Sequence, residues 1–259
     1  MDNTKPFVIL YKPLGSTPLS TVEQFRLDNP HYSNVKLSYA GRLDPMAEGL
    51  LFVLIGDANK ERRTYEKLDK TYECSFLFGI STDSYDGMGL ITNDTTPPSL
   101  SELKQHIAKT LPLFLGKIVQ DLPPYSSYRV NGRPLFAWAR ENRLGTITMP
   151  QTTVTIHNMT LDGIRMEKTQ QFAESFIRTI QTVKGEFRQN EIIDGWTKFL
   201  HKSIITEYPV ASFTVSCSSG TYIRALTKRF EQLLHIPCMV RYIKRTTIGA
   251  YSFSDVAVT

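Results

Sequence analysis

An aspartate in a loop is the first place in this sequence where chemistry could occur. Asp44 precedes Pro45 in the stretch 41–51 (GRLDPMAEGLL), where a loop opens onto an apolar run. A side-chain carboxylate can stabilise or covalently capture a developing electrophile. Asp-Pro is also common turn chemistry. The residues alone therefore leave two interpretations, a nucleophile and an aspartate that only shapes a turn.

An arginine in an unfavourable position is the second candidate. Arg224 ends the stretch 219–224 (SGTYIR), in the first turn of a predicted helix. The helix macrodipole disfavours a cation there by about 0.3 to 1 kcal/mol. A carboxylate partner would offset that cost, whereas an arginine that faces solvent would need no partner. Both interpretations stay open at this level.

Other kinds of site find little support. Five histidines are scattered along the chain, none with a Cys, Asp or Glu at a recognised ligand spacing: His31, His106, His157, His201 and His235. The loop 83–87 (DSYDG) lacks the spacing of a calcium loop, so a turn is favoured. No GxGxxG or GxxxxGK[ST] motif occurs, which argues against a nucleotide cofactor. We therefore expect neither a metal nor a cofactor.

Strands and helices must position these residues, and they follow one another without a regular βαβ rhythm. Alternating apolar residues or short apolar runs predict strands, and apolar residues at helical spacing predict helices. The expected strands cover 7–11, 49–56, 72–80 and 211–217, and the expected helices cover 20–27, 99–111 and the stretch between the turn at 218–220 and Pro237. Ser99 and Glu102 form a capping box at the start of the second helix. Tyr72 lies at the open end of a strand that is expected to be half-buried.

Composition and organisation favour one folded α+β domain over residues 1–259, built on a mixed sheet. Of the 259 residues, 41% are hydrophobic and 21% are charged, which excludes a disordered chain, a collagen or a coiled-coil rod. No internal repeat and no Gly/Ser/Pro linker divides the sequence.

Net charge and cysteine content bear on partners and location. A net charge of +5 weakly favours a polyanionic partner, and a solvated basic surface explains it equally well. The longest apolar run, 50–55, is too short to span a membrane, and residues 1–12 do not resemble a secretory signal. Three widely spaced cysteines suit a reducing compartment. We expect a cytoplasmic protein without membrane contact.

Six stretches of the chain together resemble the TruB family of tRNA pseudouridine synthases. The stretch 41–51 resembles that family's catalytic motif, G-x-L-D-P-x-A-x-G-x-L. The other similar stretches occur along the chain in the same order as in the family: 11–17 (YKPLGST), 70–72 with 79–89 (KTY, GISTDSYDGMG), 120–140, 219–224 and 241–253. The resemblance implies the pseudouridine synthase fold, with a mostly antiparallel central sheet flanked by helices and loops.

Four positions depart from the family pattern, and part of the chain has no counterpart in it. Tyr39 replaces the usual His, Arg42 a small residue or Thr, Leu122 a Pro, and Arg129 a Lys. The Arg-Leu-Asp triplet is instead similar to the RluA and RsuA branches.

Residues of about 165–205 have no counterpart, and Phe172, Phe176, Ile180, Val183 and Phe187 form one helical stripe there. This predicts an inserted helix that packs on the body rather than a partner-binding face. Because the chain stops six residues after Phe253, we expect no C-terminal RNA-binding domain of the PUA type.

The resemblance also implies a reaction and roles for residues. Uridine would be isomerised to pseudouridine, with Asp44 as the nucleophile and Arg224 as its ion-pair partner. Such a partner would hold the carboxylate ionised and oriented. Tyr72 would stack on the extruded uracil and assist proton removal from C5, with Tyr222 in the same pocket. Residues implied in substrate binding are Lys12, Tyr39, Arg42, Arg129, Arg133, Lys244 and Arg245.

The expected substrate is the uridine at position 55 in the T-arm stem-loop of tRNA, modified by a monomer. An RluA- or RsuA-like enzyme acting on ribosomal RNA is the nearest alternative. A catalytically weak RNA-folding chaperone is an alternative of a different class, and a nucleoside hydrolase is a remote third.

Overall fold

The computed structural model describes residues 6–257. Its strands are β1 (Phe7–Lys12), β2 (Leu37–Ala40), β3 (Ala47–Ile55), β4 (Lys70–Phe78), β5 (Ile80–Thr82), β6 (Ile91–Asp94), β7 (Gly116–Asp121), β8 (Arg129–Val130), β9 (Arg133–Pro134), β10 (Gln151–Lys168), β11 (Glu207–Cys217) and β12 (Cys238–Ile248). Its α-helices are α1 (Pro18–Asp28), α2 (Arg62–Glu66), α3 (Leu100–Thr110), α4 (Leu135–Arg140), α5 (Thr169–Thr182), α6 (Gln189–Lys202) and α7 (Leu226–Leu234). Within the described residues, no helix has the length and apolar character needed to cross a membrane.

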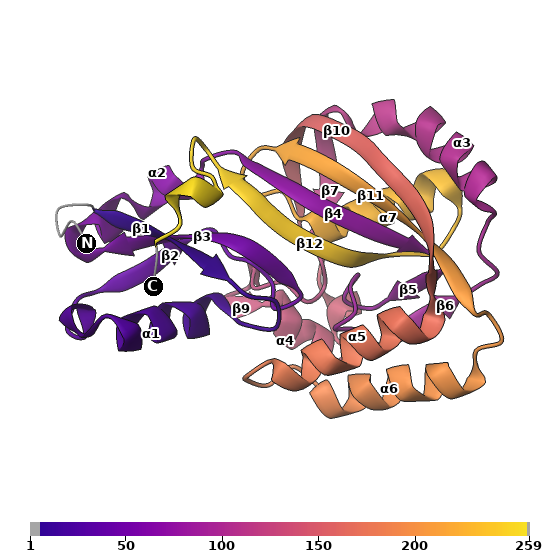
Figure 1. Ribbon diagram of the computed structural model, residues 1–259, viewed down its shortest axis with the longest axis horizontal. Helices are drawn as coiled ribbons and strands as arrows, with labels where there is room; N and C mark the ends of the chain where they lie inside the picture. Colours follow the sequence, from indigo (N-terminus) through magenta and orange to yellow (C-terminus); the bar gives the residue numbers. More distant parts are fainter. Residues whose placement is uncertain (1–5, 258–259) are drawn as a thin grey trace.

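One large sheet organises the molecule (Figure 1). Its strand order is β1-β3-β12-β4-β11-β10-β7, and β2 pairs with β3 off this path. Only the β3–β12 pairing is parallel among the strand pairs of this sheet, and the others are antiparallel. The expectation of a mixed, mostly antiparallel sheet with flanking helices is confirmed. Strands of two to four residues form two small hairpins, β5–β6 and β8–β9, beside it.

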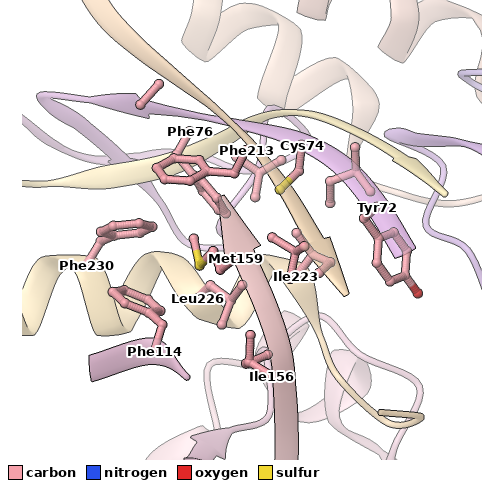
Figure 2. Close-up of a cluster of buried hydrophobic side chains, with 14 of the residues drawn as sticks. Tyr72, Cys74, Phe76, Phe114, Ile156, Met159, Phe213, Ile223, Leu226 and Phe230 are labelled. Atoms are coloured by element: carbon pink, nitrogen blue, oxygen red, sulfur yellow. The ribbon is translucent and has the colours of Figure 1, made fainter. Parts of the chain in front are cut away.

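The main hydrophobic cluster lies on one face of this sheet. Alternate residues of β4, among them Tyr72, Cys74 and Phe76, point into it, as the alternation predicts. Figure 2 shows Tyr72 at the edge of the cluster, with its hydroxyl directed away from the other labelled side chains. The strand is nevertheless not half-buried throughout. Ser75 and Leu77, on the opposite face, are also buried, because a second apolar cluster covers that end of the strand.

One expected helix begins where its capping signal indicates, the helix expected at 20–27 extends over Pro18–Asp28, and a third begins later than expected. Ser99 caps α3, and Glu102 completes the capping box. After the turn at 218–220 the chain first forms a 3-10 turn, Ile223–Ala225, and α7 begins only at Leu226. Arg224 therefore lies in a 3-10 turn before the helix and not in the first α-helical turn. The unfavourable interaction between a cation and the helix macrodipole, inferred from the sequence, is therefore weaker for Arg224 than for a residue inside the first turn of α7.

Residues 165–205, where the sequence predicted one helix, contain two helices. β10 runs to Lys168, so residues 165–168 belong to the sheet. The helices α5 and α6 then form a hairpin, which runs along the lower side of Figure 1 and returns the chain to β11. Phe172, Phe176 and Ile180 are buried on α5, as the stripe predicts. Phe187 belongs to the tip between the helices, because α5 ends at Thr182.

Candidate active site

Asp44 and Arg224 form a bidentate ion pair, 180 residues apart in the sequence. The Arg224 Nε atom donates to Asp44 Oδ2 at 2.7 Å, and Nη2 donates to Oδ1 at 3.0 Å. Asp44 lies in the loop between β2 and β3, where Gly41 adopts a positive φ of 83° and lets the chain turn. The Arg224 side chain is 3% exposed and the Asp44 side chain 38% exposed. The arginine is thus a buried support, and the carboxylate remains accessible.

A second carboxylate shares the same guanidinium. Asp86 Oδ2 lies 3.5 Å from Arg224 Nε, and Asp86 is itself buried. Its Oδ1 accepts hydrogen bonds from Ser84 Oγ at 2.6 Å and from the Met88 amide at 3.0 Å. Burial raises the pKa of Asp86, and the Arg224 charge and the Ser84 hydrogen bond oppose that rise.

Two backbone carbonyls complete the shell around Arg224. The Ser84 carbonyl accepts from Nη1 at 2.7 Å, and the Tyr125 carbonyl accepts from Nη2 at 3.4 Å. Burial on its own would lower the pKa of Arg224, but Asp44 and Asp86 raise it above its ordinary value. The guanidinium is therefore permanently charged and is fixed from four sides. Asp86 was not among the residues expected from the sequence, where 83–87 was interpreted only as a turn.

The Asp44 loop separates two cavities. The Tyr72 cavity, about 530 Å³, has Tyr72, Tyr222, Ser126 and Thr221 among its lining residues. The Tyr39 cavity, about 430 Å³, is lined by residues that include Tyr39, Tyr125, Phe136, Phe187 and Arg188. Arg42, Leu43 and Asp44 line both. Each volume is within the range of small-ligand sites.

The two tyrosines of the Tyr72 cavity are held in place by buried surroundings. Burial raises the pKa of Tyr72 to about 12, although the nearby Arg245 charge opposes the rise. The Tyr72 hydroxyl is therefore protonated at neutral pH. Burial also raises the pKa of Tyr222, whose backbone amide donates to Gln120 Oε1 at 2.8 Å. Aromatic walls of this kind suit a planar base.

Two of the cations expected to hold RNA are instead internal supports. Lys12 is fully buried, and its Nζ donates to the carbonyls of Pro13 at 2.9 Å and Ser16 at 2.7 Å. Arg245 is 1% exposed, and its Nε donates to the Leu50 carbonyl at 2.8 Å. These donor groups are bonded to backbone oxygens and do not face solvent. The expectation that Lys12 and Arg245 contact an RNA phosphate is therefore wrong. Lys12 stabilises the chain after β1, and Arg245 lines the Tyr72 cavity while supporting the Asp44 loop.

The remaining expected cations are more accessible but do not all reach the cavities. Arg42 is exposed and lines both cavities. Arg129 and Arg133 lie on the β8–β9 hairpin, outside the lining of either cavity, where Arg133 pairs with Glu141. Lys244, on β12, lies over the ring of Phe253 and also lines neither cavity.

The structure thus separates the expected site residues into two groups. Residues brought together at the two cavities are Asp44, Arg224, Tyr72, Tyr222, Tyr39, Arg42 and Arg245. Residues outside both are Lys12, Arg129, Arg133 and Lys244. Among residues 6–257, no group of three or more His, Cys, Asp or Glu side chains is arranged to hold a metal ion.

Known proteins resemble this chain in sequence and in fold. The tRNA pseudouridine synthase B of Endomicrobium trichonymphae is 28% identical over 257 residues, which cover 98% of this chain and 89% of that protein. The enzyme of the same name from Syntrophus aciditrophicus is 28% identical over 217 residues, covering 84% of this chain but 54% of the relative. The chain therefore spans little more than half the length of some relatives.

Solved structures show the same fold at lower sequence identity. A structure of a Cbf5-Nop10-Gar1 complex contains a chain with a TM-score of 0.54 and 16% identity, covering 95% of this chain and 50% of that one. A structure of an H/ACA RNP bound to a substrate RNA that contains 2'-deoxyuridine gives a TM-score of 0.52 at 15% identity. The family pattern for the N-terminal domain of the TruB family pseudouridylate synthases matches residues 30–175, more than half of the sequence, and the chain belongs to this family.

Proposed function

We propose that this protein isomerises uridine to pseudouridine in tRNA, with Asp44 as the nucleophile. The observation that carries the proposal is the accessible Asp44 carboxylate, held by the buried Arg224 fork on the wall of a cavity that Tyr72 and Tyr222 line. Family membership and relatives named tRNA pseudouridine synthase B support the same activity.

The reaction exchanges one bond to the sugar for another without any redox change. The bond between C1' of ribose and N1 of uracil breaks, the uracil turns while it stays bound, and a bond forms between C1' and C5. The proton on C5 leaves, and N1 takes up a proton. Asp44 would stabilise the electron-poor intermediate by forming an adduct with it, which divides one difficult step into two.

The other site residues would keep the detached base in place. The Tyr72 ring, in a buried wall of the cavity, would stack on the uracil while it turns. Its hydroxyl, with a pKa of about 12, would act as a protonated hydrogen-bonding group at neutral pH. Because Glu48 is hydrogen-bonded to Tyr242 and does not line the Tyr72 cavity, it is not placed as a second carboxyl group that would activate water. Glu66 does line the Tyr72 cavity, but it forms an ion pair with Arg62 at 2.8 Å, so this arrangement favours isomerisation over hydrolysis.

The target base must leave its RNA helix or loop to reach this cavity. Extrusion of a nucleotide costs a few kcal/mol, which contacts to the RNA backbone must offset. Exposed cations near the cavity mouths, Arg42 first among them, would supply such contacts. We propose uridine 55 in the T-arm stem-loop as the target.

We further propose a cytoplasmic monomer that acts as one catalytic domain. The main sheet is continuous from β1 to β7, which supports one domain. The three cysteines are free and buried, which suits a reducing compartment. Light scattering of the purified protein would measure its oligomeric state.

Release of tritium from RNA labelled at C5 of uridine tests the activity. The wild-type protein should release tritium from T-arm stem-loops and leave no free uracil. Asp44→Asn should abolish release while the dissociation constant for tRNA changes by less than about tenfold, because backbone contacts supply most of the affinity. Asp57→Asn, at a highly exposed aspartate, is the matched control and should keep the wild-type rate.

Each alternative function gives a different result in that assay. Release from ribosomal RNA fragments only would identify an enzyme of the RluA or RsuA type. Tight tRNA binding without release by the wild-type protein would indicate an RNA-folding chaperone. Free uracil in stoichiometric amounts would indicate a hydrolase.

A further inference from the structure

The tip of the α5–α6 hairpin places one arginine against two segments of the active site. Arg188 has a left-handed backbone conformation, with φ of 62°, just before α6. Its guanidinium makes a bidentate pair with Asp83, at 2.9 Å from Nη1 to Oδ2 and 3.2 Å from Nη2 to Oδ1. The same guanidinium lies over the ring of Tyr125, 4.1 Å from its centroid. The side chain is 17% exposed, so these contacts are largely shielded from water.

Both partners of Arg188 belong to segments whose backbone holds Arg224. Asp83 is followed directly by Ser84, whose carbonyl accepts from Arg224 Nη1 at 2.7 Å. Tyr125 itself contributes the carbonyl that accepts from Arg224 Nη2 at 3.4 Å. The chain of contacts therefore passes from Arg188 through Asp83 and Tyr125 to Arg224, and from Arg224 to Asp44. The links are hydrogen bonds, ion pairs and a cation–π contact, together with the peptide bond that joins Asp83 to Ser84.

The hairpin is anchored well enough to act as a fixed support. Trp196 of α6 donates from Nε1 to the Gly87 carbonyl at 2.9 Å, and it is fully buried. Arg140 of α4 donates to the carbonyl of Glu186 at the hairpin tip. A non-glycine residue keeps a left-handed conformation only when its surroundings compensate for the strain. At Arg188 the paired carboxylate and the stacked ring provide such surroundings.

We infer that Arg188 is a positioning residue, which fixes the Ser84 and Tyr125 carbonyls and through them the orientation of the Arg224–Asp44 pair. This inference rests on the proposed function. It gives the α5–α6 hairpin a task in the reaction. Small displacements of a reacting group cost large factors in rate, up to about a hundredfold for 1 Å. The hairpin would therefore affect the chemical step more than RNA binding.

Single-turnover kinetics with saturating enzyme test this inference. Arg188→Ala should lower the rate constant of pseudouridine formation by about tenfold or more, with the dissociation constant for tRNA changed by less than about twofold. Arg188→Lys should restore only part of the rate, because an ammonium cannot make the bidentate pair and stack at the same time. Arg178→Ala is the control, because Arg178 pairs with Glu174 on the exposed side of the same hairpin. That variant should match the wild type.

Asp83→Asn provides a second variant that keeps the shape of the side chain. Because Asp83 and Arg188 act through one contact, the double variant should be no slower than Arg188→Ala alone, within about threefold. A multiplied loss would contradict the inference. So would an unchanged rate constant in Arg188→Ala, or tRNA binding weakened tenfold with an unchanged rate at saturation, which would make Arg188 an RNA contact.

Hydrogen exchange of the protein without RNA tests the geometry separately from the activity. In Arg188→Ala, amide exchange should accelerate in 83–90 and 122–128, and it should not in Arg178→Ala. The Leu90 amide is a direct reporter, because it donates to Asp83 Oδ1 at 2.9 Å. Unchanged exchange in both segments would overturn the inference even if the wild type is active. Accelerated exchange in a protein whose wild type makes no pseudouridine would support the positioning contact and reject the proposed function.

Discussion

One buried guanidinium serves two carboxylates in the candidate active site, and the two differ in their access to solvent. Arg224 contacts Asp44, which faces both cavities, and Asp86, which is buried. An unpaired buried charge is costly, and removal of one partner leaves the others uncompensated. Asp86 thus helps to keep Arg224 in the place from which it orients Asp44. The rigid fork of arginine suits this task, because it can donate to several acceptors in fixed directions.

Asp86→Asn should therefore slow the reaction without removing the nucleophile. We expect the single-turnover rate constant to fall by about tenfold or more, because a displaced Arg224 no longer orients Asp44. The free energy of unfolding should fall by about 1 to 3 kcal/mol, because Arg224 loses a charged hydrogen-bonding environment. Asp162→Asn, at an exposed aspartate bonded to Thr214, is the control for both measurements. A full rate in Asp86→Asn would show that Asp44 is oriented without it.

Resemblance to the family predicted part of this site. The pairing of Arg224 with Asp44 was expected through family resemblance, and the structure shows it. Asp86 was overlooked because a sequence gives no sign that a turn aspartate is buried beside a distant arginine. The resemblance implied that Lys12 and Arg245 bind RNA, a role that requires exposed donor groups. Both are buried, and their donors are bonded to backbone carbonyls that only the folded chain brings near them.

At the scale of elements, the α5–α6 hairpin packs directly on the loop that carries Asp83 and Asp86. Its apolar cluster includes Phe176 and Trp196, together with Leu77 of β4. This second layer explains why β4 is buried on both faces near its end. Alternation along β4 could be detected in the sequence, but a helix pair far away in the chain could not be assigned to the opposite face. The chain turns at 183–188 between α5 and α6. The apolar stripe of the sequence gives no sign of this turn, so only one helix was predicted there.

Gly87 lies at the contact between this hairpin and the loop. A Cβ atom at position 87 would lie 2.3 Å from Phe176 Cδ1, which is too close for any real contact. Gly87→Ala should displace the hairpin or the loop and lower the free energy of unfolding by about 1 to 3 kcal/mol, as overpacking does. It should also reduce the single-turnover rate constant, because the same loop holds Arg224.

Gly145→Ala is the matched control for that substitution. A Cβ atom at position 145 would meet nothing within 4 Å, and the φ angle of Gly145 is not in the left-handed region. Denaturant unfolding of both variants measures the difference. Equal stability of the two would show that the hairpin adjusts freely, in contradiction to the close contact at Gly87.

At the scale of the whole molecule, burial of titratable groups should give stability an optimum in mildly alkaline solution. Burial lowers the pKa of Lys12 to about 7 and that of Lys70 to about 8. Burial raises the pKa of Cys74 and Cys238, and raises that of Cys217 to about 11. In the unfolded chain, lysine titrates near 10.4 and cysteine near 8.5. The lysines and the thiols therefore act in opposite directions as pH rises.

The free energy of unfolding should rise by about 1 kcal/mol from pH 7 to 8.5 and then fall by about 1 to 2 kcal/mol by pH 10. In the lower interval the unfolded chain binds more protons than the folded chain, because Lys12 has lost its proton only when folded, so stability increases with pH. Above pH 8.5 the three thiols ionise only in the unfolded chain, and this loss of stability outweighs the gain that the two lysines still contribute. Urea unfolding at several pH values measures both slopes. Lys12→Met should remove the initial rise, whereas Lys36→Met, at an exposed lysine, should keep it. A rise that survives in Lys12→Met would show that the buried Lys12 stays protonated in the folded protein, held by the Pro13 and Ser16 carbonyls and the nearby Asp44 charge.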